Sequence, residues 1–345
     1  MTTASAAVPT APATPNAPAG TVNTVQALNQ ALVDAMQEDP RIVVFGEDVA
    51  DPEGGGVIGV SRGLSTRFGA ARVRSTPIAE QAIIGAAIGA SLAGMRPVVE
   101  IMLMNFTTVA MDMLVNHAAK LRFMSGGQTH VPITVRMMTG AGNSTGGQHA
   151  DYLEAWFAHT AGLKVVIPSS PADAYGLLRS CIEDEDPCLF IENMLTYRVS
   201  GTAPASGTRI PLGKANVLHA GTDVSLFTYG RQVGDALAVA EKLASEGIKV
   251  EVIDLRTVSP LDDATIFASV DKTGRAVVVH EATKNFGVGA EVSSRIHEAL
   301  FKRLKAPVQR VGAAFCAVPF SKPLETAFVP SRAAIEAAVR RTLAA

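Results

Sequence analysis

The stretch "STPIAEQAIIGAAIGASLAGMRPVVEIMLMNF", residues 75–106, decides the fold class. After Glu80, residues 81–94 are almost all small or aliphatic, so a helix here would be apolar on every side, which is typical of a buried helix. Residues 97–104, "PVVEIMLM", form a short apolar run typical of a strand buried on both faces. A buried helix that leads directly into a buried strand indicates an α/β fold.

The same alternation of helix and strand continues through the chain. Strand patterns are expected at 41–48, 97–104, 132–138, 164–169, 187–193, 223–230, 249–256 and 275–282. Helical patterns are expected at 25–39, 106–125, 152–162, 171–184, 232–247, 262–272 and 288–304. Strands that alternate with helices predict βαβ units and parallel sheets with both faces covered. In such sheets, ligands bind at the carboxyl ends of the strands.

Composition divides the chain into four parts. Residues 1–24 are mostly Ala, Pro and Thr without a basic or long apolar region, which predicts a disordered arm and not a signal peptide. Residues 198–214 are rich in Gly, Pro, Ser and Thr, which predicts a linker. The first α/β domain is therefore expected at 25–197 and the second at 215–345, a division that suits a chain of 345 residues.

Charge and cysteine usage narrow the class of protein. The net charge is −2 and the basic residues are scattered, so neither a nucleic-acid footprint nor a membrane-binding patch is expected. No apolar run reaches the length of a membrane span. The three cysteines form no CxxC pair, which fits buried thiols in a reducing compartment. We therefore expect a cytoplasmic protein.

Familiar short motifs are mostly missing. The glycine-rich loop "TGAGNSTGG" at 139–147 lacks the Lys and Ser/Thr of a phosphate-binding loop, and the chain has no HExxH or GxSxG. Nucleotide-binding, zinc-enzyme and hydrolase interpretations are therefore weak. His149 follows this loop, where a histidine serves as an acid, a base or a hydrogen-bond donor to substrate, or is simply solvated.

Glu80 is the only ionisable residue in residues 75–94. One interpretation is a first-turn acid that the helix dipole stabilises. The other follows from its apolar surroundings, because a buried carboxylate without a partner is strongly unfavourable. A bound ligand with a protonatable ring nitrogen would supply that partner.

The order of several motifs resembles the β subunit of thiamine diphosphate-dependent 2-oxo acid dehydrogenases, the E1 component, and of the related acetoin dehydrogenase. The resemblance covers about residues 22–345 and rests on "VVFGEDV", the stretch at 75–106, "AAKLRFMSGGQ", "GGQHADYLEAWFAHTAGLKVVIPS", "DPCLFIEN" and "VVVHEATKNFGVGAEV". It implies a pyrimidine-binding α/β domain followed by a domain similar to the transketolase C-terminal domain.

The resemblance also implies roles for individual residues. Glu80 would hydrogen-bond N1′ of the cofactor's aminopyrimidine and so promote deprotonation of the thiazolium ring, and His149 would handle the acyl intermediate and its transfer to a lipoyl arm. Other implied positions are Met102 and Phe106 at the cofactor, Glu47 and Asp112 in an acidic chain between two active sites, and Ile133, Cys181, Asp184 and Asp186 at a monovalent cation such as K⁺.

Two departures from the family pattern bear on substrate and partners. Ala150 and Asp151 stand where many relatives have Ser and Gln, which puts the substrate in doubt. The chain has no GDG motif for Mg²⁺ and the cofactor's diphosphate, so the resemblance implies an α subunit that holds them, in an α2β2 assembly with a lipoyl E2 acyltransferase as a further partner.

We therefore expect the β subunit of an E1 that decarboxylates a pyruvate-like 2-oxo acid and reductively acylates the lipoyl group of E2. Cleavage of acetoin is the alternative. A non-catalytic assembly subunit of the same fold and a free-standing, monomeric nucleotide-binding protein also remain open.

Overall fold

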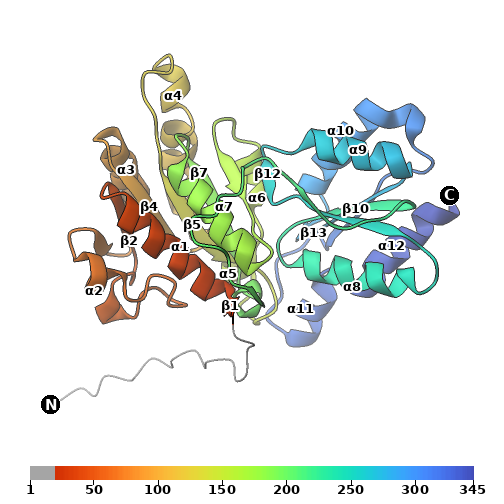
Figure 1. The fold of residues 1–345 in the computed structure, drawn as a ribbon, viewed down its shortest axis with the longest axis horizontal. Coiled ribbons are helices and arrows are strands. Elements are labelled where there is room, and N and C mark those ends of the chain that lie inside the picture. Colours follow the sequence, from red (N-terminus) through yellow and green to blue (C-terminus); the bar gives the residue numbers. More distant parts are fainter. Residues whose placement is uncertain (1–19) are drawn as a thin grey trace.

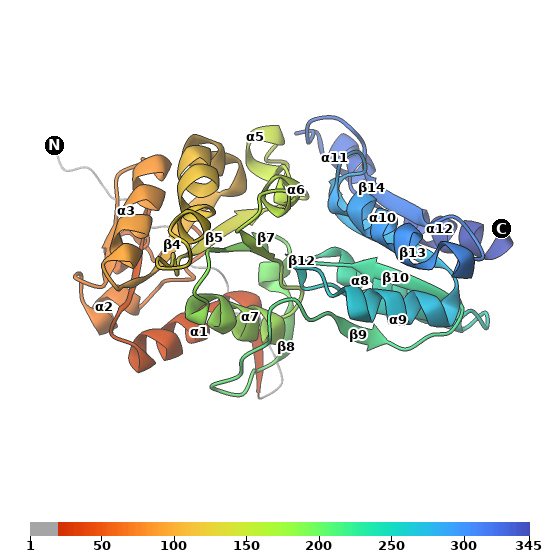
Figure 2. The same cartoon turned by 90° about the horizontal axis from the view of Figure 1, so that it is seen from above.

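The computed structural model describes residues 20–345, and the first 19 residues of the predicted arm lie outside these described residues. Two α/β units lie side by side, with the first coloured red to green and the second cyan to blue (Figures 1 and 2). Among the described residues, no helix combines the length and apolar character needed to cross a membrane.

A seven-stranded sheet forms the centre of the first unit. Its strands are β2 (Ile42–Gly46), β3 (Val73–Ser75), β4 (Arg96–Leu103), β5 (Thr134–Thr139), β6 (Lys164–Val166), β7 (Cys188–Asn193) and β12 (Thr257–Ser259). Their order is β12-β6-β7-β5-β4-β2-β3. All neighbours are parallel except β12, which pairs antiparallel with β6 at one edge. The predicted parallel α/β architecture is therefore present.

Helices cover both faces of this sheet. They are α1 (Thr24–Glu38), η1 (Asp51–Glu53), α2 (Leu64–Phe68), α3 (Glu80–Leu92), η2 (Met104–Ala110), η3 (Met113–Ala118), α4 (Leu121–Met124), α5 (Gly147–Ala150), α6 (Glu154–Ala158), α7 (Pro171–Glu183) and η4 (Thr196–Arg198). Helices α1 and α7 pack on one face, and α3, η2, η3 and α6 pack on the other. Along β4, Val98 packs in the apolar cluster beneath α1 and α7, whereas Val99 and Ile101 pack in the cluster beneath α3. The side chains alternate because successive residues of a strand point to opposite faces of the sheet.

The second unit contains a five-stranded sheet in the order β14-β13-β10-β11-β9. Its elements are β9 (Asn216–His219), β10 (Val224–Thr228), α8 (Gln232–Ala244), β11 (Val250–Asp254), α9 (Asp263–Thr273), β13 (Ala276–Thr283), α10 (Val288–Leu300), η5 (Phe301–Arg303), β14 (Gln309–Ala313), α11 (Lys322–Phe328) and α12 (Arg332–Ala344). Helices α8 and α12 cover one face, and α9 and α10 cover the other. The cluster beneath α9 and α10 is continuous with that beneath α3, so one apolar core crosses the boundary.

The ends of the first domain differ from the prediction. Strand β1 (Thr21–Asn23) pairs antiparallel with β8 (Ser200–Thr202), so residues 21–24 are not part of a disordered arm and the predicted linker contains a strand. Asn23 also caps α1 by accepting a hydrogen bond from the Gln26 amide. Local composition did not indicate this pairing because the two strands lie far apart in the sequence.

Two helices of the first domain also differ from their predictions. Helix α3 was predicted to be buried on every side, but Gln81, Ala82, Ala86 and Gly89 are exposed in this chain. The predicted helix at 106–125 is instead 3₁₀ in η2, π-helical in η3 and α-helical only in α4. The spacing of apolar residues does not distinguish these helical forms when the segment is packed on one side.

Candidate functional site

The predicted site residues follow neighbouring strands of the first sheet. Glu47 follows β2, Glu80 follows β3, Phe106 follows β4 and His149 follows β5. These strands are adjacent and parallel in the order β5-β4-β2-β3, so their carboxyl ends lie along one edge. This is the edge at which parallel α/β sheets bind ligands. The topology therefore brings four separate motifs to one place.

Glu80 and Glu47 form the acidic part of this edge. Glu80 is the first residue of α3 and is buried. Within residues 20–345, no hydrogen bond or ion pair reaches its carboxylate, and the buried Oε1 of Glu47 has no partner either. Burial and the nearby charge of Glu80 raise the pKa of Glu47. Two close, buried and unpaired carboxyl groups form a site that favours a ligand able to donate hydrogen bonds.

Phe106 and His149 form the aromatic part. Their ring centroids are 5.6 Å apart with an interplanar angle of 74°, an edge-to-face contact. The buried Nδ1 of His149 has no hydrogen-bond partner among the described residues. Phe106 also packs against the cluster beneath α3, the helix that begins with Glu80. The structure therefore connects the aromatic pair to the acidic pair through the packing of η2 on α3.

Asn105 and Asp151 hold the short turn that carries His149. Asn105 Nδ2 donates to Gly147 O at 2.9 Å and to Asp151 Oδ2 at 3.0 Å, and the Asp151 amide donates to Asn105 Oδ1 at 3.2 Å. Thr139 Oγ1 donates to Asp151 O at 2.7 Å. Burial raises the pKa of Asp151, while Asn105 opposes that rise. Asp151, which departs from the family pattern, is therefore hydrogen-bonded to Asn105, the residue next to Phe106 in the sequence.

Three amides of the glycine-rich loop before His149 are bound within the protein and not available to a phosphate. The Ala141 amide donates to Glu281, and the Gly142 and Ser144 amides donate to Glu325. Both carboxylates come from the second domain. These contacts explain why a loop with the composition of an anion site need not bind a nucleotide.

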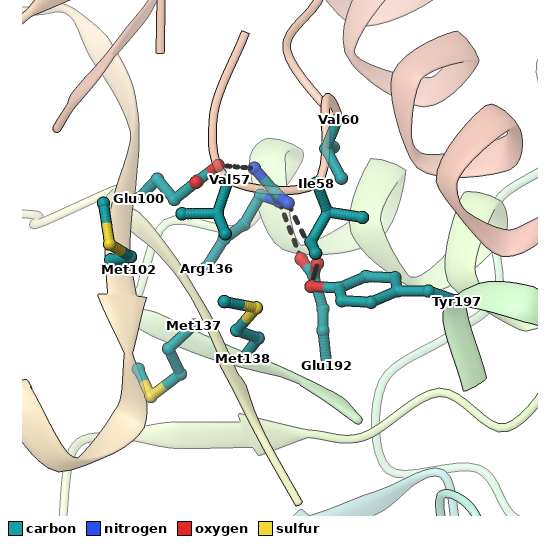
Figure 3. A pocket seen from close by; sticks show the side chains of 10 residues that line it. All are labelled: Val57, Ile58, Val60, Glu100, Met102, Arg136, Met137, Met138, Glu192 and Tyr197. Carbon is teal, nitrogen blue, oxygen red and sulfur yellow. Dashed lines mark hydrogen bonds and ion pairs between the residues drawn. The ribbon is translucent and has the colours of Figure 1, made fainter. Parts of the chain in front are cut away.

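A buried ion-pair network on the other face of β4 was not predicted from the sequence. Arg136 binds Glu192 through Nε at 2.7 Å and Nη2 at 2.9 Å, and binds Glu100 through Nη1 at 2.7 Å (Figure 3). Tyr197 donates to Glu192 at 2.6 Å. The available signal was a charged residue within each of three apolar strands, at Glu100, Arg136 and Glu192.

Met102 lies beside this network (Figure 3). The small pocket it lines does not include Glu80, Phe106 or His149, so its contact with a cofactor stays a prediction. Asp112 is also apart from the acidic pair. Its side chain is 53% exposed, near His117 and Asn116. A role in a chain of acids between two active sites would require a partner surface at this position.

The positions predicted for a monovalent cation are brought together around the turn from α7 to β7. The backbone oxygen of Ile133 accepts from Cys188 N, that of Cys181 from Asp184 N, and that of Asp184 from Arg96. Lys164 Nζ binds the Asp184 carboxylate at 2.6 Å and Asp186 at 3.3 Å. Across the described chain, no cluster of His, Cys, Asp and Glu side chains could hold a metal ion. A cation here would depend on backbone oxygens that already accept hydrogen bonds.

Comparison with known proteins identifies the family. Residues 20–199 match the family model of the transketolase pyrimidine binding domain, and residues 213–335 match that of the transketolase C-terminal domain. The chain belongs to the transketolase-like family of E1 β subunits. The β subunit of acetoin:2,6-dichlorophenolindophenol oxidoreductase from Cupriavidus necator is 43% identical over 92% of this chain and 96% of its own length.

One further relative agrees with this family, and one solved structure agrees with the fold. The pyruvate dehydrogenase E1 component subunit β from Bacillus subtilis is 44% identical over 92% of this chain and 98% of its own length. A solved structure titled as a split-gene transketolase, an inactive β4 tetramer, has a TM-score of 0.77 at 23% identity and covers 94% of this chain and 98% of its own, which shows the fold. The matches confirm the resemblance predicted from the sequence and the expected order of the two domains.

The family depends on thiamine diphosphate, and its E1 β subunits act with an α subunit. The residues of this chain fit one end of that cofactor. The Glu80 carboxylate, which no hydrogen bond or ion pair reaches within residues 20–345, and the unpartnered Oε1 of Glu47 suit a protonated or N–H-bearing ring. Phe106, in contact with His149, offers an aromatic ring at the same edge. Three amides of the glycine-rich loop are already bound to Glu281 and Glu325, so they are not available to a diphosphate.

Proposed function

We propose that the chain is the catalytic β subunit of an E1 that acts on a small carbonyl substrate and passes the acyl product to a lipoyl group. The observation that carries the proposal is the convergence of Glu47, Glu80, Phe106 and His149 at the ends of four adjacent strands. An assembly subunit without catalysis would not require two unpaired acids to be buried together at the ligand-binding edge.

Glu80 is proposed to hold the ring nitrogen N1′ of the cofactor's aminopyrimidine. The bound cofactor would supply the carbon nucleophile and the electron sink for cleavage of a bond next to a carbonyl group. Glu80 suits its role because burial strengthens a hydrogen bond that its carboxylate accepts. Glu47 would lie beside Glu80 as a second acid, and its own pKa is raised by burial and by that neighbour. Phe106 would pack on the pyrimidine, and Met102 would contact it from β4.

His149 is proposed to serve the acyl-transfer step. Its imidazole is half-buried beside Phe106, and its buried Nδ1 is free to bind substrate or exchange a proton. The proposed substrate is a pyruvate-like 2-oxo acid, with acetoin as the second candidate. Asp151 favours the second candidate, because a carboxyl group two residues from His149 opposes an anionic substrate when ionised.

The proposed assembly is α2β2, in which the α subunit holds Mg²⁺ and the diphosphate, with a lipoyl E2 acyltransferase as a further partner. Several apolar side chains on the first domain are exposed in the isolated chain, among them Ile78 at 82% and Phe123 at 86%. Such side chains suit burial against another subunit. The three cysteines are free, which fits the proposed cytoplasmic location.

A monovalent cation such as K⁺ is proposed at the α7–β7 turn, held by backbone oxygens of Ile133, Cys181, Asp184 and Asp186. The proposal is tested by thermal unfolding in KCl and NaCl at equal ionic strength. Specific binding predicts a higher Tm in KCl, whereas equal Tm values would mean that Lys164 and Arg96 alone complete the turn.

The function is tested with Glu80→Gln in the complex of this chain and its α subunit. Dye reduction would be measured with pyruvate, branched 2-oxo acids and acetoin, in the presence of thiamine diphosphate and Mg²⁺. We expect one substrate class to be turned over and the variant to lose at least about a hundredfold of that activity, the scale of losing a key proton-transfer group. Cofactor binding, measured by calorimetry, reports whether the site still forms.

Glu291→Gln is the matched control. Glu291 is also a first-turn acid of a 13-residue helix, but it is exposed and lies in the second domain. If Glu80 only stabilised its helix, both substitutions would cost a few tenths to about 1 kcal/mol of stability and neither would abolish activity. That outcome would contradict the proposed role of Glu80. A monomeric chain that binds nucleotide without an α subunit would contradict the whole assignment.

A further inference from the structure

The second domain binds the loop that precedes His149 through hydrogen bonds. Glu325, on α11, accepts hydrogen bonds from the Gly142 amide at 2.6 Å and the Ser144 amide at 2.9 Å. Glu281, on β13, accepts from the Ala141 amide at 2.7 Å. Three backbone N–H groups of one short loop are thus bound by two carboxylates from the other domain. Burial raises the pKa of Glu281, so the two bonds to Glu325 are the ones we treat as charge-assisted. Charge-assisted hydrogen bonds are stronger than neutral ones.

Basic side chains of the second domain contact the same loop. Arg231 donates to Ala141 O at 3.2 Å, and Lys322 reaches Gly142 O and the Glu325 carboxylate. Burial alone raises the pKa of Glu325, but hydrogen bonds from Gly142 and Ser144 outweigh it and leave the pKa below its ordinary value. Glu325 is therefore ionised at neutral pH, which is the form that binds backbone amides most strongly.

Apolar contacts hold the same loop. Ala141 and Ala150, on either side of His149's turn, pack in a buried cluster with Val318, Phe328 and other second-domain residues. Gly146 has a φ of +74°, and a Cβ at that position would lie 2.4 Å from the Phe320 ring. The segment at 317–328 therefore contacts the loop along most of its length. Figures 1 and 2 both place α11 next to α5, the turn that carries His149.

We infer that Glu325 and Glu281 are positioning residues for His149. The first domain holds the loop at Thr139 on β5, at Asn143 beside Met194, and through Asn105 at Gly147 and Asp151. The amides of Ala141, Gly142 and Ser144 are bound by the second domain, which therefore helps to fix where the backbone runs and where the imidazole sits beside Phe106. The inference rests on the proposed role of His149 in acyl transfer, and it gives the second domain a part in that step in addition to assembly.

The test compares two activities of the assembled complex of this chain with its α subunit. Dye-linked turnover reports cleavage of the substrate, and acylation of free lipoamide reports the transfer assigned to His149. The decisive quantity is the ratio of the second activity to the first. Pyruvate and acetoin would both be tried, and the substrate that the wild-type complex turns over would be used.

Glu325→Ala is expected to lower this ratio about ten- to a hundredfold, the scale of a small misplacement of a reacting group. Glu325→Gln keeps an oxygen toward the loop amides, so it should lower the ratio in the same direction but less. Ser169→Ala is the matched control, because Ser169 makes another hydrogen bond between the domains, to Asp254, away from the loop. It should leave the ratio unchanged.

Each outcome decides a different point. If Glu325→Ala fails to assemble with the α subunit, Glu325→Gln carries the test, since its side chain has the same shape. If both Glu325 variants behave like Ser169→Ala while His149→Ala lowers the ratio, the positioning role is wrong and the proposed role of His149 stands. If His149→Ala leaves the ratio unchanged, the role of His149 in transfer is wrong and the inference falls with it.

Discussion

Tyr229 donates a 2.7 Å hydrogen bond to Glu154 across the boundary between the two domains. Glu154 begins α6, Tyr229 follows β10, and both side chains are buried. The second carboxylate oxygen of Glu154 has no partner in the described part of the chain. Burial raises the pKa of Glu154 to about 7, although the Tyr229 hydroxyl opposes that rise. In the folded chain, burial therefore favours the protonated form of this acid, whereas the hydrogen bond from Tyr229 favours the ionised form.

This pKa predicts the pH dependence of one contribution to stability. A carboxyl group whose pKa is higher in the folded chain favours folding below its ordinary pKa of 4.5 and loses that advantage as the pH rises to about 7. In the wild-type chain this change should lower the free energy of unfolding by about 3 kcal/mol between these pH values, and Glu154→Gln should abolish it. Denaturant unfolding at pH 5 and pH 8 measures it. Exposed Glu241→Gln should leave the dependence unchanged, and equal curves for both variants would contradict the prediction.

The Arg136 network predicts a large effect of losing one charge. Arg136→Met leaves Glu100 and Glu192 buried without their cation, so the free energy of unfolding should fall by about 3–5 kcal/mol. Arg209→Met also removes an arginine that binds two carboxylates, but that site is exposed and should cost at most about 1 kcal/mol. A Tm shift of similar size in both variants would mean that Arg136 contributes no more than a surface ion pair.

The exposed apolar residues of the first domain predict where another subunit binds. Ile78 stands two residues before Glu80, and its side chain is almost fully exposed. We expect Ile78→Asp to weaken co-purification with the α subunit by tenfold or more, since a charge in the middle of an interface is costly. Phe301→Asp, at an exposed position of the second domain, serves as control. Unchanged assembly of the Ile78 variant would place the interface elsewhere.

Asp151 predicts the preference between charged and neutral substrates. Asp151→Asn removes a half-buried carboxyl group near His149, so kcat/KM for pyruvate should rise about tenfold relative to acetoin, a change of roughly 1.4 kcal/mol. The difference should become smaller as the pH falls, because the wild-type carboxyl group loses its charge at low pH and its raised pKa makes it do so earlier than an ordinary Asp. Asp271→Asn removes a surface charge and should leave kcat/KM for pyruvate relative to acetoin unchanged at any pH. A ratio for Asp151→Asn equal to that of this control would exclude a role in specificity.

The sequence predicted the fold class well because both domains repeat a simple pattern. Buried strands such as β4 and β5 are nearly continuous apolar runs, and helices follow them at short intervals. The position of the site at the carboxyl ends followed from the same pattern. Phe106 and His149 follow strands that the sequence predicted, whereas strand β3, which precedes Glu80, was not predicted. The roles of these residues stay predictions.

Features that depend on distant pairing were not predicted. Glu281 and Glu325 bind a loop that precedes them by more than a hundred residues, and no local composition indicates that contact. The pairing of β1 with β8 has the same cause. The irregular helices after β4 were missed for a different reason, since 3₁₀, α and π turns place apolar residues on similar faces. Only for the distant pairings do the deciding contacts lie outside the stretch of sequence that a local pattern covers.

Strand β12 limits how this protein can be divided for study. The chain between the two matched family domains, at 200–212, is where an engineer would cut, but the strand that closes the first sheet at β6 comes from residues 257–259. A fragment ending at the cut would expose β6 as an unprotected edge, which invites aggregation through strand pairing. Separate expression of the halves should therefore yield an insoluble first half, which would be rescued when the second half is supplied in the same cell.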